Sequence, residues 1–169
     1  MNRLVIIDYG SGNLRSAAKS CERVIREQGL QTDVSVTGNP DDLKSASHIM
    51  LPGVGAFGDC RRGLNAVDGM VEALREAVER QAKPFLGVCV GMQLMATRGL
   101  EYGEHEGLGW IEADCVHIAP EDPALKVPHM GWNDLQFLKP DHPVFAGISS
   151  GEHAYFVHSY HLTCKNPAE

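Results

Sequence analysis

The chain has 169 residues, of which 43% are hydrophobic and 22% charged, a composition typical of soluble globular proteins and not of disordered or fibrous ones. With 15 basic and 22 acidic residues the net charge is −7, and no cluster of lysine and arginine indicates a nucleic-acid surface. No apolar run approaches the roughly 18 residues that a membrane span needs. We therefore expect one cytoplasmic domain over residues 1–169.

The cysteines argue against a disulfide framework and against a metal centre. They are odd in number, scattered, and never at Cys-x-x-Cys spacing: Cys21, Cys60, Cys89, Cys115 and Cys164. Reduced thiols of this kind suit the cytosol. The sequence predicts neither a metal ion nor a cofactor.

The first 40 residues alternate apolar runs with an amphipathic stretch. Leu4–Asp8 predicts a buried strand that ends at the loop Tyr9–Asn13. The following stretch carries apolar residues on one face up to Gly29, which predicts a helix ending there. Asp33–Val36 and His48–Leu51 predict two further strands.

Helices are expected between and after these strands. Pro40–Leu43 predicts the start of a short helix with proline in its first turn. Pro52–Gly58 interrupts the third strand, and a helical stretch then runs over Asp59–Gln81, weakened by Gly63 and Gly69. Strands that alternate with helices predict an α/β fold: an open, largely parallel sheet with helices on both faces.

The most informative stretch, residues 84–93, reads Pro-Phe-Leu-Gly-Val-Cys-Val-Gly-Met-Gln. Phe85–Val88 predicts a buried strand and Met92–Ala96 the start of a helix, so Cys89 stands at the sharp turn between them. Gly-x-Cys-x-Gly at this place is the thiol form of a nucleophile elbow. A Cβ at either flanking glycine would crowd the turn.

The helix expected after Cys89 would direct its unpaired N–H groups at the sulfur and favour the thiolate. Gln93 lies one helical turn further on, so its amide can share the site. The alternative interpretation is a buried core cysteine, since cysteine is among the residue types most often found inside. The two glycines favour the nucleophile, although an elbow alone does not name a reaction.

Beyond the elbow the pattern changes. Leu100–Gly109 is rich in glycine and glutamate and predicts a loop. Trp110–Ile118, Trp132–Leu138 and Tyr155–Leu162 predict additional, antiparallel strands in the C-terminal half. Pro120–Pro123 is the one stretch expected to be flexible, and it is too short to separate domains.

In parallel sheets ligands bind beyond the carboxyl ends of the strands. We therefore expect Tyr9–Asn13, Pro52–Gly58 and the turn at Cys89 to meet there. Gly10-Ser11-Gly12 also admits a dinucleotide-binding interpretation, but the third glycine of that motif and a placed acidic ribose partner are missing.

Five segments of the chain together resemble the class I (triad) glutamine amidotransferases, which have a flavodoxin-like fold. They are Asp8–Ser16 (Asp-Tyr-Gly-Ser-Gly-Asn-Leu-Arg-Ser), Leu51–Gly58 (Leu-Pro-Gly-Val-Gly-Ala-Phe-Gly), Gly87–Gln93, Lys126–Asn133 (Lys-Val-Pro-His-Met-Gly-Trp-Asn) and Tyr155–Tyr160 (Tyr-Phe-Val-His-Ser-Tyr). Within that family they resemble the glutaminase subunits that serve histidine biosynthesis. The matches span nearly the whole chain.

The resemblance implies hydrolysis of L-glutamine to glutamate and ammonia through a thioester on Cys89. It implies a heterodimer in which the ammonia passes to a cyclase subunit that makes imidazole glycerol phosphate and AICAR. The oxyanion donors would be the backbone N–H groups of Val90 and Val54. Family positions that hold glutamine are matched by Gly55, Gln93, Ser159 and Tyr160, and positions that face the cyclase by Asn13, Met130 and Trp132.

The family's remaining triad residues belong to a His-Pro-Glu motif that does not occur here, since His142-Pro143 is followed by Val144. We therefore expect this chain to lack the triad histidine and glutamate and the last strands, and to be inactive by itself. Two other classes remain open from the residues: a different elbow-cysteine hydrolase or thiol stress protein, and a non-catalytic module that binds a partner.

Several residues also allow purely structural interpretations. Met130 and Trp132 could be core residues, and Tyr155–Leu162 could be only a half-buried strand. His129 and His158, each among apolar neighbours, are more typical of hydrogen-bonded structural histidines than of bases.

Overall fold

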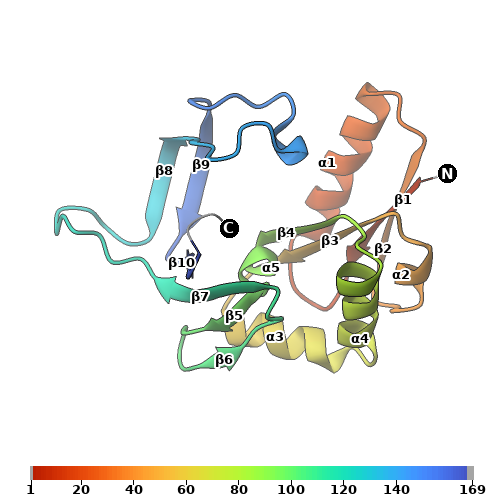
Figure 1. The fold of residues 1–169 in the computed structure, drawn as a ribbon, viewed down its shortest axis with the longest axis horizontal. Helices are drawn as coiled ribbons and strands as arrows, with labels where there is room; N and C mark the ends of the chain where they lie inside the picture. The colour runs from red at the N-terminus through yellow and green to blue at the C-terminus, as the bar shows by residue number, and fades with distance from the viewer. Residues whose placement is uncertain (1, 167–169) are drawn as a thin grey trace. The chain divides into compact units, whose positions relative to one another are not determined.

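The computed structural model describes residues 2–166, which form two compact units (Figure 1). The first unit contains residues 2–116 and 162–166. The second contains residues 117–161.

The first unit is built on a sheet of four parallel strands in the order β2-β1-β3-β4. The strands are β1 (Asn2–Ile7), β2 (Thr32–Thr37), β3 (His48–Gly53) and β4 (Phe85–Cys89). Only β1 and β3 contain fully buried residues. The expectation that Phe85–Val88 is a buried strand is wrong, because Leu86 and Val88 are 45% and 42% exposed in β4. The register of β3 and β4 places Gly53 opposite Cys89.

Helices lie on both faces of this sheet, with α1 on one side and α3 and α4 on the other (Figure 1). They are α1 (Leu14–Glu27), α2 (Asp42–Ser45), α3 (Phe57–Ala66), α4 (Met70–Arg75), the π-helical turn η1 (Glu76–Arg80) and α5 (Val90–Gln93). The α/β fold expected from the alternation of strands and helices is confirmed.

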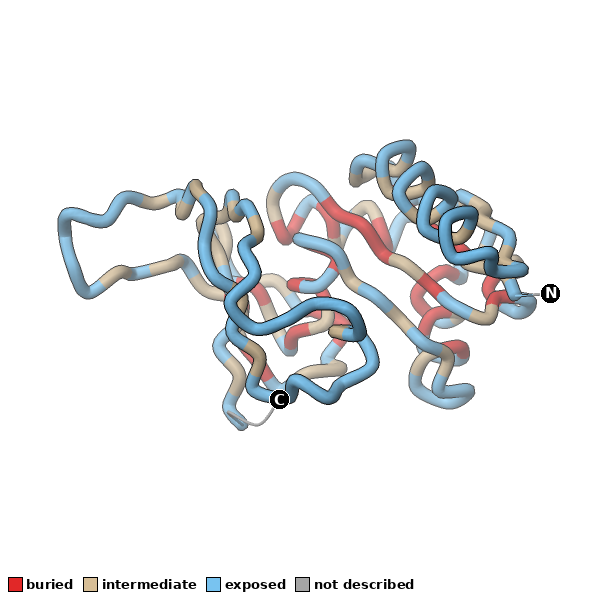
Figure 2. Tube along the Cα trace, turned by 90° about the horizontal axis from the view of Figure 1, so that it is seen from above, coloured by how far each residue is buried: buried red, intermediate tan, exposed pale blue. Residues whose placement is uncertain are grey.

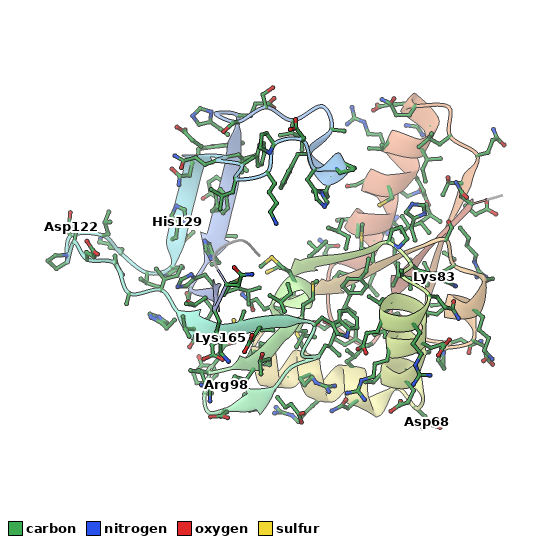
Figure 3. The ribbon with its side chains drawn as sticks, viewed as in Figure 1. Asp68, Lys83, Arg98, Asp122, His129 and Lys165 are labelled. Carbon is green, nitrogen blue, oxygen red and sulfur yellow. The ribbon has the colours of Figure 1, made fainter. Side chains whose placement is uncertain are left out.

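A second sheet follows, in the order β10-β7-β5-β6. Its strands are β5 (Ala96–Gly99), β6 (His105–Glu106), β7 (Ile111–His117) and β10 (Tyr160–Cys164). A forked pair of hydrogen bonds from Arg98 to Asp114, at 2.9 and 3.0 Å, joins β5 to β7 (Figure 3). Lys165 donates to Glu112 at 2.7 Å, so charged side chains tie the first unit's part of this sheet together.

The second unit is a two-stranded antiparallel ribbon with a 3₁₀ turn. Its elements are β8 (His129–Asp134), η2 (Pro143–Phe145) and β9 (His153–His158). None of residues 117–161 is fully buried.

The hydrophobic core therefore belongs to the first unit (Figure 2). Its largest fully buried side chains include Val5, Ile6, Ile7, Ile49, Leu51, Phe57, Leu64, Met70 and Leu74. Strands β1 and β3 contribute the middle of this core, which gives the carboxyl ends of these strands a rigid base.

The expected elements need several corrections. The stretch Leu100–Gly109, expected to be a loop, contains the short strand β6. The helical stretch Asp59–Gln81 breaks before α4, because Gly69 adopts a left-handed φ of +72°. The helix expected over Met92–Ala96 ends at Gln93, and Ala96 already belongs to β5. The strand expected over Trp132–Leu138 is shifted to β8, which ends at Asp134. The strand expected over Tyr155–Leu162 is two strands, β9 and β10, separated by Ser159.

Candidate active site at the Cys89 elbow

Cys89 ends β4 in a backbone conformation that side chains rarely adopt. Its φ and ψ are 55° and −118°, and α5 begins at the next residue. Positive φ at a non-glycine residue costs about 1–3 kcal/mol and is characteristic of functional sites. The thiol is exposed, so the interpretation of Cys89 as a buried core cysteine is wrong.

The glycines around Cys89 have the steric role that the sequence predicts. A Cβ at Gly91 would lie 1.8 Å from the carbonyl oxygen of Leu51, and a Cβ at Gly87 would lie 2.5 Å from Cα of Met92. Gly53, opposite Cys89, would place a Cβ 2.7 Å from the backbone nitrogen of Gly91. The elbow exists because three backbone segments approach where no side chain fits.

One part of the elbow differs from the expectation. Helix α5 has only four residues, since Leu94 and Met95 turn away to meet the second sheet: the N–H groups of Leu108 and Trp110 bond to their carbonyls at 2.7 and 2.9 Å. A single turn provides little of the aligned dipole that a long helix would direct at the sulfur. The exposure of Cys89 and its strained backbone are therefore the features that mark this thiol.

The three loops expected at the carboxyl edge of the sheet do meet. Tyr9, directly after β1, is buried and donates its hydroxyl to the carbonyl of Pro52 at 2.8 Å. Burial, together with neighbouring Cys60, raises the pKa of Tyr9, so the phenol remains a donor. A Cβ at Gly12 would lie 3.0 Å from Cβ of Pro52.

Ser11 holds Val54, one of the two expected oxyanion donors, from both sides. The Val54 N–H donates to Ser11 Oγ at 3.0 Å, and the Ser11 hydroxyl donates to the Val54 carbonyl at 2.7 Å. The Cys60 thiol lies 3.3 Å from Ser11 Oγ. In this conformation the Val54 N–H is committed to Ser11. A Cβ at the next residue, Gly55 (φ +111°), would meet no atom within 4 Å, so the loop has space to rearrange.

The sequence placed Ser11 in this loop but did not predict its bonds to Val54. The two residues are 43 positions apart, and no local pattern connects them. The only signal was a hydroxyl residue between two glycines in a loop expected at the same edge of the sheet.

The other expected site residues occupy separate places. Val90 and Gln93 are both buried in α5, directly beyond Cys89. Asn13 caps α1, with its side-chain oxygen accepting the N–H of Ser16 at 3.3 Å, which is a structural role. Ser159 and Tyr160 belong to the second unit, where Ser159 follows β9 and Tyr160 begins β10.

The β8–β9 ribbon places its expected partner-facing residues at the surface. Met130 and Trp132 are 61% and 70% exposed, so their interpretation as core residues is wrong. Their cross-strand neighbours Val157 and Tyr155 are exposed too, which gives the ribbon an exposed apolar face. In contrast, the half-buried His158 donates its Nδ1–H to the Tyr160 carbonyl at 2.9 Å, and its Nε2 lies 3.3 Å from Nδ1 of His129. These contacts are those of structural histidines.

Neither a metal cluster nor a membrane helix is found in the described residues. Across residues 2–166, no three His, Cys, Asp or Glu side chains come together as a metal site would require. Over the same range, no helix combines the length and the apolar character needed to cross a membrane.

The steric argument at the elbow gives a stability prediction. We expect Gly91→Ala to lower the free energy of unfolding by about 3 kcal/mol or more, because its Cβ would overlap the Leu51 carbonyl. The matched control is Gly29→Ala, which, unlike Gly91, has a positive φ but whose added Cβ would meet no atom within 4 Å, and it should cost about 1 kcal/mol. Equal losses in urea denaturation would contradict the steric role of Gly91.

The environments of the five thiols give a reactivity prediction. Cys89 is exposed, whereas Cys60 and Cys115 are buried. Burial, and to a smaller extent the negative charge of Glu101, raises the pKa of Cys115 to about 12. Burial also raises the pKa of Cys21. Limiting iodoacetamide at pH 8 should therefore label Cys89 first, with half-buried Cys164 as the internal comparison. Peptide mapping that finds another cysteine labelled faster would overturn this order.

Comparisons with known proteins agree with the elbow geometry. Residues 5–169 match the family model of glutamine amidotransferase class-I. In shape, the chain resembles a protein described as "Crystal structure of glutamine amidotransferase", with a TM-score of 0.65 over 90% of this chain and 70% of that one. At 20% identity this likeness shows the fold alone.

Closer relatives are bacterial proteins named "Imidazole glycerol phosphate synthase subunit HisH". The one from Rhodospirillum rubrum is 56% identical over 98% of this chain and 78% of its own length. The one from Agrobacterium fabrum is 57% identical over 99% of this chain and 78% of its own length. The one from Rhizobium meliloti is 57% identical over 96% of this chain and 76% of its own length. The chain belongs to the class I glutamine amidotransferase family.

Proposed function

We propose that this chain is the glutaminase subunit of imidazole glycerol phosphate synthase, and that it supplies ammonia to a cyclase subunit in histidine biosynthesis. The observation that carries the proposal is the exposed Cys89 thiol at a strained elbow, in a chain whose residues 5–169 match the glutamine amidotransferase class-I family. The relatives that are 56–57% identical carry the name of that synthase subunit.

Cys89 would act as nucleophile on the side-chain amide of L-glutamine. Its thiolate forms a bond to the carboxamide carbon, and the C=O electron pair moves onto oxygen. When the tetrahedral intermediate collapses, the C–N bond breaks and the nitrogen leaves as ammonia after receiving a proton from a general acid. Water then attacks the thioester, releasing glutamate and regenerating the thiol.

The developing oxyanion needs donors that point at it. The Val90 N–H lies directly after the nucleophile, and the Val54 N–H lies one residue beyond Gly53, the β3 partner of Cys89. Because Ser11 accepts that second N–H, the oxyanion hole becomes complete only when the Ser11 bond breaks. A cyclase that binds more tightly to the conformation in which the Ser11–Val54 hydrogen bond is broken would favour that conformation and so raise the glutaminase rate.

Substrate and partner contacts complete the proposal. Gly55, Gln93, Ser159 and Tyr160 would hold the substrate glutamine. The apolar face of the ribbon, formed by Met130, Trp132, Tyr155 and Val157, would contact the cyclase in a cytoplasmic heterodimer, because such a patch is rarely left uncovered. Asn13 would add a contact from the start of α1.

We further propose that the general base and the residue that orients it come from a His-Pro-Glu segment outside the 169 residues. Among the described histidines, His129 and His158 bond to each other, and His158 also bonds to the Tyr160 carbonyl. His153 is paired with Asp134 at 2.8 Å on the exposed ends of β8 and β9. These surroundings are those of structural or surface residues.

Glutamate production in the presence of the cyclase tests the activity. A gene product that includes the His-Pro-Glu segment should hydrolyse glutamine, its Cys89→Ala variant should lose at least about 10³-fold, and the 169-residue chain should be comparably slow. An unchanged rate in Cys89→Ala would overturn the proposed nucleophile. A fast 169-residue chain would instead place the base among the histidines already present.

The Ser11 contact predicts how the activity is restrained. In the active gene product, Ser11→Ala removes the acceptor of the Val54 N–H and should raise cyclase-independent glutaminase activity about fivefold, the value of one ordinary hydrogen bond. The control is Ser16→Ala, an exposed serine on α1 that should leave the rate unchanged. An unchanged or lower basal rate in Ser11→Ala would show that Ser11 does not restrain the loop.

A further inference from the structure

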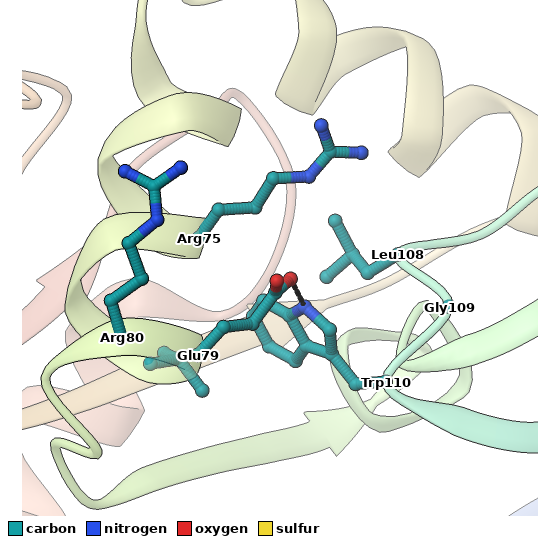
Figure 4. Close-up of a pocket in the computed structure, with 7 residues that line it drawn as sticks. Arg75, Glu79, Arg80, Leu108, Gly109 and Trp110 are labelled. Atoms are coloured by element: carbon teal, nitrogen blue, oxygen red, sulfur yellow. Dashed lines mark hydrogen bonds between the residues drawn. The ribbon is translucent and has the colours of Figure 1, made fainter.

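A second concave site lies at the opposite end of β4 from Cys89. This cavity of about 680 Å³ opens beside η1, and its lining includes Arg75, Glu79, Leu108 and Trp110 (Figure 4). The Trp110 ring packs edge-on against Phe85, the first residue of β4, with ring centres 4.9 Å apart. Cys89 ends the same strand about 13 Å further on, so the cavity is separate from the elbow.

The π-helical turn η1 contributes Val78, Glu79 and Arg80 to the lining of this cavity. Arg75 and Glu79 are four residues apart, a spacing at which opposite charges pair along an α-helix. Here the Gln81 N–H bonds to the Glu76 carbonyl five residues back, and Arg80 pairs with Glu76 at 2.8 Å. π-helical turns are rare and frequently occur at functional sites.

The two charges at the cavity are therefore kept apart. Glu79 accepts a hydrogen bond from the indole N–H of Trp110, while the Arg75 side chain extends over the cavity toward Leu108 (Figure 4). Within residues 2–166, Arg75 forms no ion pair. The cavity thus presents a guanidinium and a carboxylate that do not neutralise each other.

A second arginine, Arg61, adds positive charge near Arg75. Burial lowers the pKa of Arg61, the carboxylates of Glu106 and Glu72 act against this shift, and the charge of Arg75 lowers it further. The Arg61 side chain donates to the Glu106 carbonyl at 3.1 Å and to Asn65, both of which are uncharged acceptors. A negative group placed beside Arg75 would relieve this repulsion.

The floor of the cavity is apolar. Leu108 is 5% exposed, and Val78 and Trp110 are half-buried. A simple anion in the cavity would meet the Glu79 carboxylate, and a simple cation would meet Arg75 and Arg80. A molecule that carries both charges on one carbon, with an apolar group attached, satisfies all three parts of the lining.

We propose that this cavity binds a free zwitterionic α-amino acid with an apolar or aromatic side chain. Its carboxylate accepts hydrogen bonds from Arg75, its ammonium donates to Glu79, and its side chain lies on Trp110 and Leu108. This site is distinct from the one proposed for substrate glutamine, and its occupancy does not depend on glutaminase activity.

Calorimetric titration of the full chain with L-phenylalanine tests the proposal, with two analogues that each lack one charge as comparisons. L-Phenylalanine should bind saturably, whereas phenethylamine, without the carboxylate, and 3-phenylpropionate, without the ammonium, should each bind at least about tenfold more weakly. Absence of saturable binding at tens of millimolar, or equal affinity for all three compounds, overturns the proposal.

Variants then assign each charge to its residue. Arg75→Gln should weaken L-phenylalanine about tenfold and leave phenethylamine unchanged, while Glu79→Gln should weaken L-phenylalanine and leave 3-phenylpropionate unchanged. The control is Arg23→Gln, an exposed arginine on α1 that should bind like the wild type. Variants that remain folded by circular dichroism and bind L-phenylalanine with wild-type affinity would show that the cavity is not the site.

Discussion

The site depends on one constraint: backbone segments at the carboxyl ends of β3 and β4 lie so close together that side chains cannot fit between them. The Leu51 carbonyl occupies the space where Gly91 would carry a Cβ, and Gly53 and Gly87 are enclosed in the same way by the turn. With side chains excluded at three positions, Cys89 is directed out of the turn. Its backbone strain is a small fraction of what the packed core beneath β1 and β3 provides.

The same close approach places the loop at Val54, which we propose as the oxyanion loop. Gly53 pairs with Cys89 in the sheet, so Val54 is the first residue free of the strand and lies next to the nucleophile. Ser11, which follows β1, reaches Val54 because β1 and β3 are neighbours in that sheet. The proposed nucleophile, the proposed oxyanion loop and the hydroxyl proposed to restrain it therefore follow from one strand order, and the proposed control of activity reduces to the orientation of one peptide group.

Local sequence patterns predicted the features of the fold that depend on neighbouring residues in the chain. The apolar runs of β1, β3 and β4, the helix ending near Gly29 and the glycines of the elbow follow from side-chain size, periodicity and backbone freedom. Family resemblance added the identity of the elbow and its proposed chemistry. The spacing of Cys89 and its glycines alone predicted a nucleophile but did not indicate its substrate.

Features set by distant partners were not predictable in this way. Helix α5 stops after one turn because the carbonyls of Leu94 and Met95 accept N–H groups from the chain just before β7, 14 and 15 residues away. The bonds between Ser11 and Val54 span 43 residues. The π-helical turn over Glu76–Arg80 has no sequence signature that periodicity could detect.

Substrate-directed labelling is the most direct test of the account. A diazoketone analogue of L-glutamine, 6-diazo-5-oxo-L-norleucine, places an electrophile where the carboxamide carbon would lie. Incubated with a gene product that carries the proposed His-Pro-Glu segment and with the proposed cyclase, it should form an adduct on Cys89, and excess L-glutamine should protect that thiol. An adduct on Cys164 or another cysteine, or labelling of Cys89 that glutamine does not slow, would contradict the assignment of the elbow as the glutamine site.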